Sequence, residues 1–229
     1  NHINQKHFFY IPERYKDGYG ASKKLFQKLI LKKPKLIIMV DCGSTSNEAI
    51  TYLNKHKIKS IIIDHHEINK PYPKSNVIIN PKKESVKKDN SILCATALTY
   101  FFIEIIIKKT KSNFKISNFL IYVLLATICD VMPLRKINKI IARNTIDNFK
   151  IQNNFALNYL FEQHGLKKKL TVDDLGFLIG PIINSGGRLN KSNYGVELLS
   201  TDNLEIIKDR SNKLIALNNK RKIIEQNIL

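Results

Sequence analysis

Cysteine and long apolar stretches are both scarce in this sequence. The three cysteines, Cys42, Cys94 and Cys129, are odd in number and widely spaced, which argues against a disulfide framework or a zinc cluster. No apolar run reaches the roughly 18 residues that a membrane-spanning helix needs, and the longest candidate, residues 119–129, fits a buried helix better. We therefore expect a protein of the reducing cytoplasm that does not cross a membrane.

A secretory leader is also missing. The N-terminus has no basic start followed by an apolar stretch and a small-residue cleavage site. It opens with the aromatic residues 7–10, which lead directly into Ile11 and Pro12 as an internal segment would. This opening predicts that the sequence starts inside a longer protein.

Acidic residues are few relative to basic ones. The chain has 19 Asp and Glu against 38 Lys and Arg, which gives a net charge of +19. Such an excess favours association with a polyanion through counterion release and electrostatic steering. However, most of the basic residues are lysine, and Ile and Asn are also abundant, a composition that AT-rich coding bias produces as well. The charge alone leaves both explanations open.

The remaining composition is that of an ordinary globular protein. Hydrophobic residues make up 43% and charged residues 25%, close to the averages of soluble domains. A chain of 229 residues buries one sizeable core, or one domain with the beginning of a second.

Two short apolar runs that end in an acid predict neighbouring strands of a parallel sheet. Lys35–Asp41 contains a short continuous apolar run, typical of a strand buried on both faces, and Lys59–Asp64 is again a strand of β-branched residues. The segment Ser44–His56 between them predicts a helix with Ser44 or a near neighbour as N-cap. A strand, a helix and a strand at this spacing form a right-handed crossover. Val77–Ile79 predicts a further short strand.

Longer helical patterns follow Asn90, so we expect an α/β fold: a parallel sheet flanked by helices, with a mainly helical second half. Gly180-Pro181 predicts a break, and residues 183–188 predict a loop. The predicted catalytic core is 1–203, and 204–229 is one long helix leading to a further domain. The other predicted helices are residues 92–109, 116–129, 137–149, 156–164 and 173–179.

The candidate site lies where the first two strands end. Ligands collect beyond the carboxyl ends of parallel strands, so Asp41 and the sequence Asp64-His65-His66 should face one cleft. Carboxylate and imidazole ligands suit Mn²⁺ or Mg²⁺. Each residue alone has a structural explanation, but two such strand ends in one crossover favour a metal site.

Asp130 is a third candidate ligand. It ends an apolar helix shortly before Pro133, where a negative charge opposes the helix dipole unless a cation compensates it. A metal shared with Asp41 and His65 would do so. Cys129 beside it is better explained by core packing.

These residues stand in blocks that resemble the DHH phosphoesterase superfamily and, within it, the RecJ family. The blocks follow one another in the superfamily's order over nearly the whole chain, and a run of such blocks is far more specific than an isolated Asp-His-His. They are residues 10–14, 18–20, 40–43, 64–66, 79–82, 126–134, 180–181 and 184–188.

The resemblance implies a metal-dependent exonuclease that degrades single-stranded DNA from the 5′ end, in DNA repair and recombination. It implies that Asp41 bridges two metals, Mn²⁺ or Mg²⁺, and that His65 and Asp130 bind one of them. By the same comparison His66 contacts the scissile phosphate, Asp64 steadies the site, and Arg188 holds a phosphate oxygen. The proposed catalytic residues are Asp41, His65, His66 and Asp130.

The sequence departs from the family pattern in places that bear on the site. The opening Asp-x-Asp block has no counterpart, which predicts an incomplete second metal site. Ile182 stands where the family usually has arginine, and Cys94–Ala97 replaces a glycine-containing turn. Gly186 and Gly187 are candidates for a phosphate-cradling loop or, equally, a tight turn.

Two other functions remain open at this point. A DHH oligoribonuclease or cyclic-dinucleotide phosphodiesterase would share the metal site but act on short substrates. A non-catalytic DNA-binding remnant would explain the altered arginine position and the missing block, although Asp41, His65 and Asp130 argue against decay.

Overall fold

A computed structural model describes residues 6–18, 20–84, 92–166, 168–188 and 191–226. The chain divides into two compact units, the first comprising Asn1–Pro12 and Asp17–Ile141 and the second Glu13–Lys16 and Ala142–Leu229. Among the described helices, none combines the length and the apolar character that crossing a membrane requires.

The first unit is built on a parallel sheet, as predicted. Its strands are β1 (Leu36–Val40), β2 (Lys59–Ile63) and β3 (Val77–Ile79), in the order β1-β2-β3. Val40 pairs with Ile63, and Ile63 with Ile79, so the three strands end in one row. The runs of β-branched residues explain this sheet, because such side chains pack well on a pleated, buried surface.

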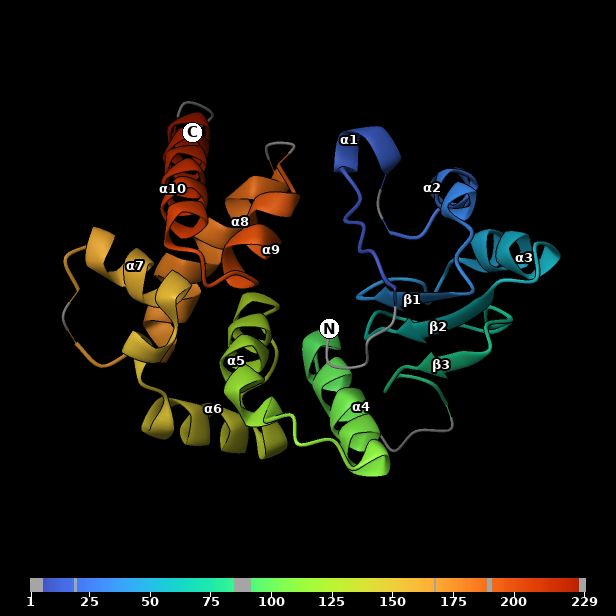
Figure 1. The fold of residues 1–229 in the computed structure, drawn as a ribbon, viewed down its shortest axis with the longest axis horizontal. Coiled ribbons are helices and arrows are strands. Elements are labelled where there is room, and N and C mark those ends of the chain that lie inside the picture. Colours follow the sequence, from blue (N-terminus) through green and yellow to red (C-terminus); the bar gives the residue numbers. More distant parts are fainter. Residues whose placement is uncertain (1–5, 19, 85–91, 167, 189–190, 227–229) are drawn as a thin grey trace. The chain divides into compact units, whose positions relative to one another are not determined.

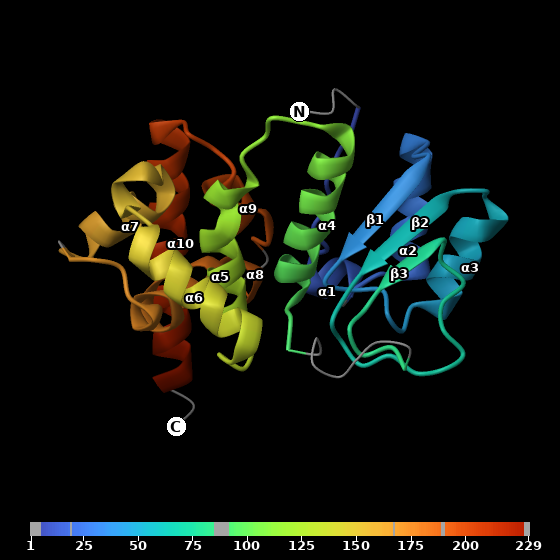
Figure 2. The same ribbon diagram turned by 90° about the horizontal axis from the view of Figure 1, so that it is seen from below.

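Helices cover both faces of the sheet (Figure 1 and Figure 2). On one face, α2 (Lys23–Leu29) and α3 (Asn47–Lys55) form a core with Met39 and Ile62. On the other face, α4 (Ala95–Thr110) packs over Ile63 together with residues of α5 (Leu120–Cys129) and α6 (Lys136–Asn148). Burial on both faces accounts for the three consecutive isoleucines, Ile61–Ile63, that end β2.

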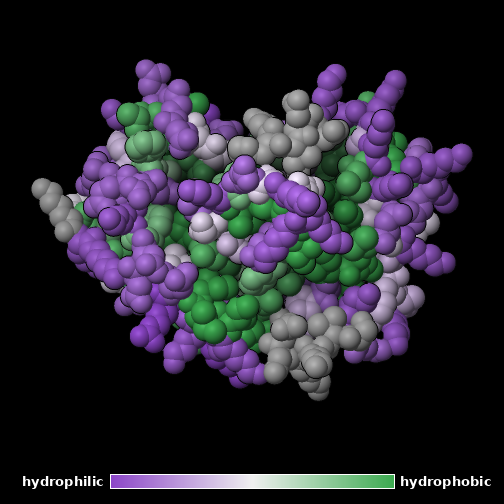
Figure 3. Space-filling view, turned by 60° about the horizontal axis from the view of Figure 1, so that its bottom comes forward, coloured by the Kyte–Doolittle hydropathy of each residue, from purple (hydrophilic) through white to green (hydrophobic). Residues whose placement is uncertain are grey.

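The expectation that the first strand is buried on both faces is wrong, because β1 is an edge strand with one uncovered side. Leu36, Ile38 and Val40 alternate along it and are exposed, whereas Met39 between them is buried. Figure 3 shows one face of the molecule on which hydrophobic side chains are exposed among hydrophilic ones.

The second unit is helical within its described part. Helix α10 (Leu204–Gln226) contacts α7 (Phe155–Gln163), α8 (Gly180–Arg188) and α9 (Asn193–Leu199), with Leu214 fully buried. Helix α10 occupies the segment where a long helix is predicted. The further domain beyond this helix stays a prediction. The shorter elements of the chain are α1 (Arg14–Asp17), η1 (Ile30–Lys32), η3 (Ile116–Phe119), η4 (Ile151–Asn153) and the π-helix η5 (Asp174–Ile179).

The predicted break at Gly180-Pro181 and the predicted loop 183–188 are wrong. The chain runs from η5 into α8 without interruption. Proline is tolerated in the first turn of a helix, but further inside it removes the hydrogen bond to the carbonyl four residues earlier and its ring clashes with that carbonyl. The wider π-helical turn directly before Pro181 accommodates this disturbance.

Candidate metal centre

The polar residues that follow the strands are held at one edge of the sheet. The Asp41 amide donates to the Ile63 carbonyl at 2.9 Å, and the Asp64 amide donates to the Ile79 carbonyl at 3.0 Å. The sheet ladder therefore continues one residue beyond β1 and β2. Asp41 adopts a left-handed conformation with φ 62°, which Asp tolerates better than most residues. This turn ends β1 and directs the chain away from the sheet.

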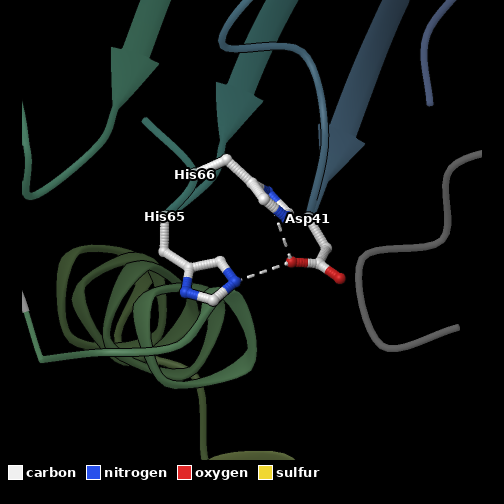
Figure 4. A group of neighbouring side chains, drawn as sticks. All are labelled: Asp41, His65 and His66. Atoms are coloured by element: carbon white, nitrogen blue, oxygen red, sulfur yellow. Dashed lines mark ion pairs between the residues drawn. The ribbon is translucent and has the colours of Figure 1, made fainter. Parts of the chain in front are cut away.

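Asp41, His65 and His66 converge, as the prediction requires (Figure 4). The Asp41 Oδ1 atom lies 3.1 Å from His65 Nε2 and 4.0 Å from His66 Nδ1. One candidate ligand atom from each of the three residues lies within 4.8 Å of the others. The hydrogen bond from His65 to Asp41 raises the pKa of His65. Partial burial lowers this pKa, but the charges of the nearby carboxylates raise it further, so it lies above its usual value.

Asp130 joins this group from a different element. It is the C-cap of α5, and its Oδ2 atom lies 3.9 Å from His65 Nε2. Partial burial raises the pKa of Asp130, and repulsion from Asp41 raises it further, more than the two histidines lower it. The convergence of Asp41, His65 and Asp130 expected from the sequence is therefore present.

Asp64 lies beneath the site and holds its two histidines. Its carboxylate is buried, with Oδ1 2.7 Å from His66 Nδ1 and accepting from the His65 amide at 2.8 Å. The other oxygen accepts from the Ser44 amide at 3.0 Å. Burial alone would raise the pKa of Asp64, but the hydrogen bonds from Ser44 and His66 together outweigh it and lower the pKa. Asp64 therefore stays ionised and orients the neighbouring groups.

Two residues of this arrangement, Ser44 and Asn80, were not identified as site residues from the sequence. Both are buried, and the Asn80 Nδ2 atom donates to Ser44 Oγ at 2.8 Å and to the His66 carbonyl at 2.9 Å. The sequence signal for Asn80 was its position directly after a strand, the same position that Asp41 and Asp64 occupy. The sequence offers Ser44, Thr45 or Ser46 as the cap of the following helix, and Ser46 is the N-cap of α3, which leaves Ser44 free for the site.

The nearby cysteines offer thiols rather than thiolates. Burial raises the pKa of Cys42 and of Cys129 to about 11, with further contributions from neighbouring aspartates. Cys94 is buried against Thr127, with its Sγ atom 3.6 Å from Thr127 Oγ1. Packing explains these residues better than metal binding does.

The donor set fits a hard divalent cation. Carboxylate and imidazole groups are the ligands that Mn²⁺ and Mg²⁺ accept, and the mutual repulsion of Asp41 and Asp130 is the charge pattern that a cation would relieve. Asp41, His65 and Asp130 would hold the ion. Asp64 would orient the His66 imidazole and the His65 backbone by hydrogen bonds, as carboxylates around metal sites commonly do.

The predicted phosphate-binding residues of the second unit belong to helix α8. Gly186 and Gly187 lie within this helix, so the cradling loop and the tight turn are both wrong as local conformations. Gly186 is explained by close packing, because a Cβ atom there would lie 2.7 Å from the Lys191 carbonyl oxygen. Arg188 is the last residue of α8, and its side chain lies outside the described part of the structure.

Comparison with known proteins gives the family. The chain belongs to the DHH family, because residues 1–128, more than half of its length, match the family's N-terminal domain. This confirms the relationship that the ordered motifs predicted.

Two curated relatives of this chain share the name RecJ. The chain is 28% identical over 229 residues to the single-stranded-DNA-specific exonuclease RecJ of Haemophilus influenzae and 29% identical over 230 residues to that of Escherichia coli. Each alignment covers 95% of this chain and 40% of the relative. The chain thus spans less than half the length of these curated relatives.

Solved structures show the same fold. A crystal structure described as exonuclease RecJ bound to manganese superimposes with a TM-score of 0.83 at 23% identity, over 96% of this chain and 55% of that one. RecJ from Thermus thermophilus in complex with Mn²⁺ gives a TM-score of 0.78 at 21% identity, over 90% and 31%. The predicted fold class is therefore confirmed.

Proposed function

We propose that this chain forms part of a metal-dependent exonuclease of the RecJ type that hydrolyses phosphodiester bonds in single-stranded DNA from the 5′ end, in DNA repair and recombination. The observation that carries the proposal is the convergence of Asp41, His65 and Asp130 at one edge of the sheet. Supporting it are the relatives named as single-stranded-DNA-specific exonucleases and the solved structures described with Mn²⁺ or Mg²⁺.

The residues have distinct roles in this proposal. Asp41, His65 and Asp130 bind the cation, with Asp41 placed to bridge to a second one. A bound divalent cation supplies positive charge that polarises the phosphodiester and stabilises charge developing on it. Asp64 keeps the His66 ring oriented through Nδ1, which leaves His66 Nε2 for the substrate. Through Nε2, His66 contacts the scissile phosphate.

The wider assignments are also proposals. Arg188 contacts a phosphate oxygen of the DNA, and residues 1–203 form the catalytic core. We place the protein in the cytoplasm, since the proposed substrate is DNA and Cys42, Cys94 and Cys129 are free thiols.

Metal binding by the 229 residues gives the first test. Titration with Mn²⁺, followed by loss of the free-ion electron paramagnetic resonance signal, should show binding that Asp41→Asn weakens at least about tenfold, the scale of changes around metal ligands. Glu48→Gln is the matched control, because Glu48 is an exposed carboxylate of the same unit that pairs with Lys23. Equal affinity in the two variants would contradict the assignment of Asp41.

Hydrolysis is then measured with labelled single-stranded DNA in Mn²⁺. The ligands among the described residues are enough for one cation, so we expect this chain alone to release mononucleotides slowly or not at all. Where release is measurable, Asp41→Asn should reduce it by up to about a thousandfold, or roughly 4 kcal/mol in the barrier. Measurable release that Asp41→Asn leaves at the same rate would overturn the proposal, and where no release is measured the Mn²⁺ titration decides it.

Substrate arms separate the alternatives. Preferential cleavage of a short oligoribonucleotide or a cyclic dinucleotide would favour the other DHH activities. Tight binding of single-stranded DNA with no Mn²⁺ binding and no product in any arm would favour a non-catalytic DNA-binding protein. Comparison of 5′-labelled with 3′-labelled DNA reports the direction of digestion.

A further inference from the structure

The His66 side chain is held in place although little of it is buried. It is 60% exposed, so packing does not define its orientation. Hydrogen bonds do so instead: the ring Nδ1 lies 2.7 Å from Asp64 Oδ1, and the backbone amide donates to the same oxygen at 3.3 Å. The His66 carbonyl accepts from Asn80 Nδ2 at 2.9 Å. The ring and both backbone groups of His66 are therefore fixed by two buried residues.

Those two residues are linked through a third. Asn80 Nδ2 also donates to Ser44 Oγ at 2.8 Å, and the amide of Ser44 donates to Asp64 Oδ2 at 3.0 Å. Asn80 Oδ1 accepts from the Lys82 amide at 2.8 Å. Asn80, Ser44 and Asp64 each come from a segment that follows a different strand, and all three are nearly inaccessible to solvent. Together they form a buried chain of hydrogen bonds that ends at His66.

The strands pair without this buried chain of hydrogen bonds. The β1 and β2 ends are already joined by the backbone bond from Asp41 to Ile63, and the β2 and β3 ends by the bond from Asp64 to Ile79. Two apolar cores, one on each face, hold the sheet as well. What the Asn80 side chain adds is control over atoms beyond the strands, in particular the His66 backbone and, through Ser44, the Asp64 carboxylate.

We propose that Asn80, acting with Ser44, is a positioning residue that sets the orientation and the tautomer of the His66 ring. The role of His66 in catalysis rests on the proposed function, but the positioning itself does not. When Asp64 accepts from Nδ1–H, the neutral ring has its free lone pair on Nε2, the nitrogen that faces away from Asp64. Without the Asn80 side chain, the His66 carbonyl and the Ser44 hydroxyl each lose a hydrogen-bond donor. The two groups are then held less firmly next to Asp64, so Asp64 selects this tautomer less strongly.

The experiment observes the His66 ring directly. Protein labelled with ¹⁵N-histidine is examined by long-range ¹H–¹⁵N correlation spectra at about pH 8.5, well above the ordinary histidine pKa. The His66 signals are assigned by their loss in His66→Gln. We expect the Nδ1–H tautomer in the unchanged chain. In Asn80→Ala and in Ser44→Ala, the ratio of the two tautomers should shift toward Nε2–H by about fivefold, the effect of one hydrogen bond.

Matched variants separate positioning from general stability. Asn54→Ala removes a similar bond in the same unit, from Asn54 Nδ2 to the Lys74 carbonyl at 2.9 Å, and should leave the His66 tautomer unchanged. Ser44→Thr retains the hydroxyl and should restore the signal lost in Ser44→Ala.

The outcomes are distinct. An unchanged tautomer ratio in folded Asn80→Ala would overturn the inference, and so would unfolding of both alanine variants, which would make the chain of hydrogen bonds purely structural. A shifted ratio in a chain that binds no Mn²⁺ would discard the proposed function and keep the positioning role.

Discussion

Two residues at the candidate metal centre have left-handed backbone conformations. Asp41 has φ 62° and Val131, which follows Asp130, has φ 53°. Asp is one of the residues that tolerate this region, but a β-branched residue in it is a genuine outlier. The turn after α5 thus contains local strain next to a candidate ligand. Strain of this kind gathers at functional sites, where the surrounding structure holds it in place.

Replacing Val131 tests this strain. The residue is 87% exposed, so Val131→Gly loses little apolar burial and gains the freedom that a positive φ requires. We expect the free energy of unfolding to rise by about 1 kcal/mol, less the entropy that glycine adds to the unfolded chain. Urea unfolding measures the change. Val77→Gly, in strand β3, is the control and should destabilise; a loss of stability in Val131→Gly would show that its conformation is not strained.

At the scale of the element, repeating patterns were predictable and individual contacts were not. The β-branched runs predicted β1, β2 and β3, and the helical spacing predicted α4, α6 and α7 within a few residues. Short helices such as α2 and α9 were missed, because seven residues give too little periodicity to recognise. The strand ends predicted Asp41 and Asp64, but the role of Asn80 depends on partners 14 and 36 residues away along the chain.

The helical segment that contains η5 begins with a capping arrangement. Thr171 Oγ1 lies 3.3 Å from the donating amide of Asp174, and Asp174 Oδ2 accepts from the Thr171 amide at 2.9 Å. Lys168 Nζ lies 2.9 Å from Asp174 Oδ1. Burial alone would raise the pKa of Asp174, but the bonds from Thr171 and Lys168 together lower it. The ionised carboxylate thus stabilises the start of this segment.

This arrangement predicts that Asp174→Ala lowers the free energy of unfolding by an amount that depends on pH. Because the pKa is lowered in the folded state, the contribution is complete above the ordinary Asp pKa of about 3.9 and disappears as the pH falls through the folded value. We expect the free energy of unfolding to fall by about 1 kcal/mol at neutral pH, as is typical when a helix cap is lost. This difference should shrink below about pH 4. Thermal unfolding across this range measures it, with Asp173→Ala as control. A loss of equal size at every pH would exclude the ionised carboxylate as its cause.

At the scale of the whole molecule, the net charge of +19 is the dominant electrostatic feature. If it was selected for phosphate contacts, binding of single-stranded DNA should weaken log-linearly with salt, by a slope of about 0.7 per phosphate contacted. Fluorescence anisotropy with a labelled oligonucleotide in EDTA measures this without hydrolysis. A flat response between low and high salt would assign the lysine excess to coding bias instead.

The common register of the three strands limits how this protein can change in length. Asp41, Asp64 and Asn80 each follow the last residue of a strand, and those last residues pair across the sheet. Insertions between the strands, for example in the connection from Glu67 to Asn76, leave that row intact. One residue added inside β1 would turn its apolar side chains to the opposite face and would move Asp41 out of the row. Relatives should therefore differ in length at their loops, while the strands that end in these polar residues keep a fixed count.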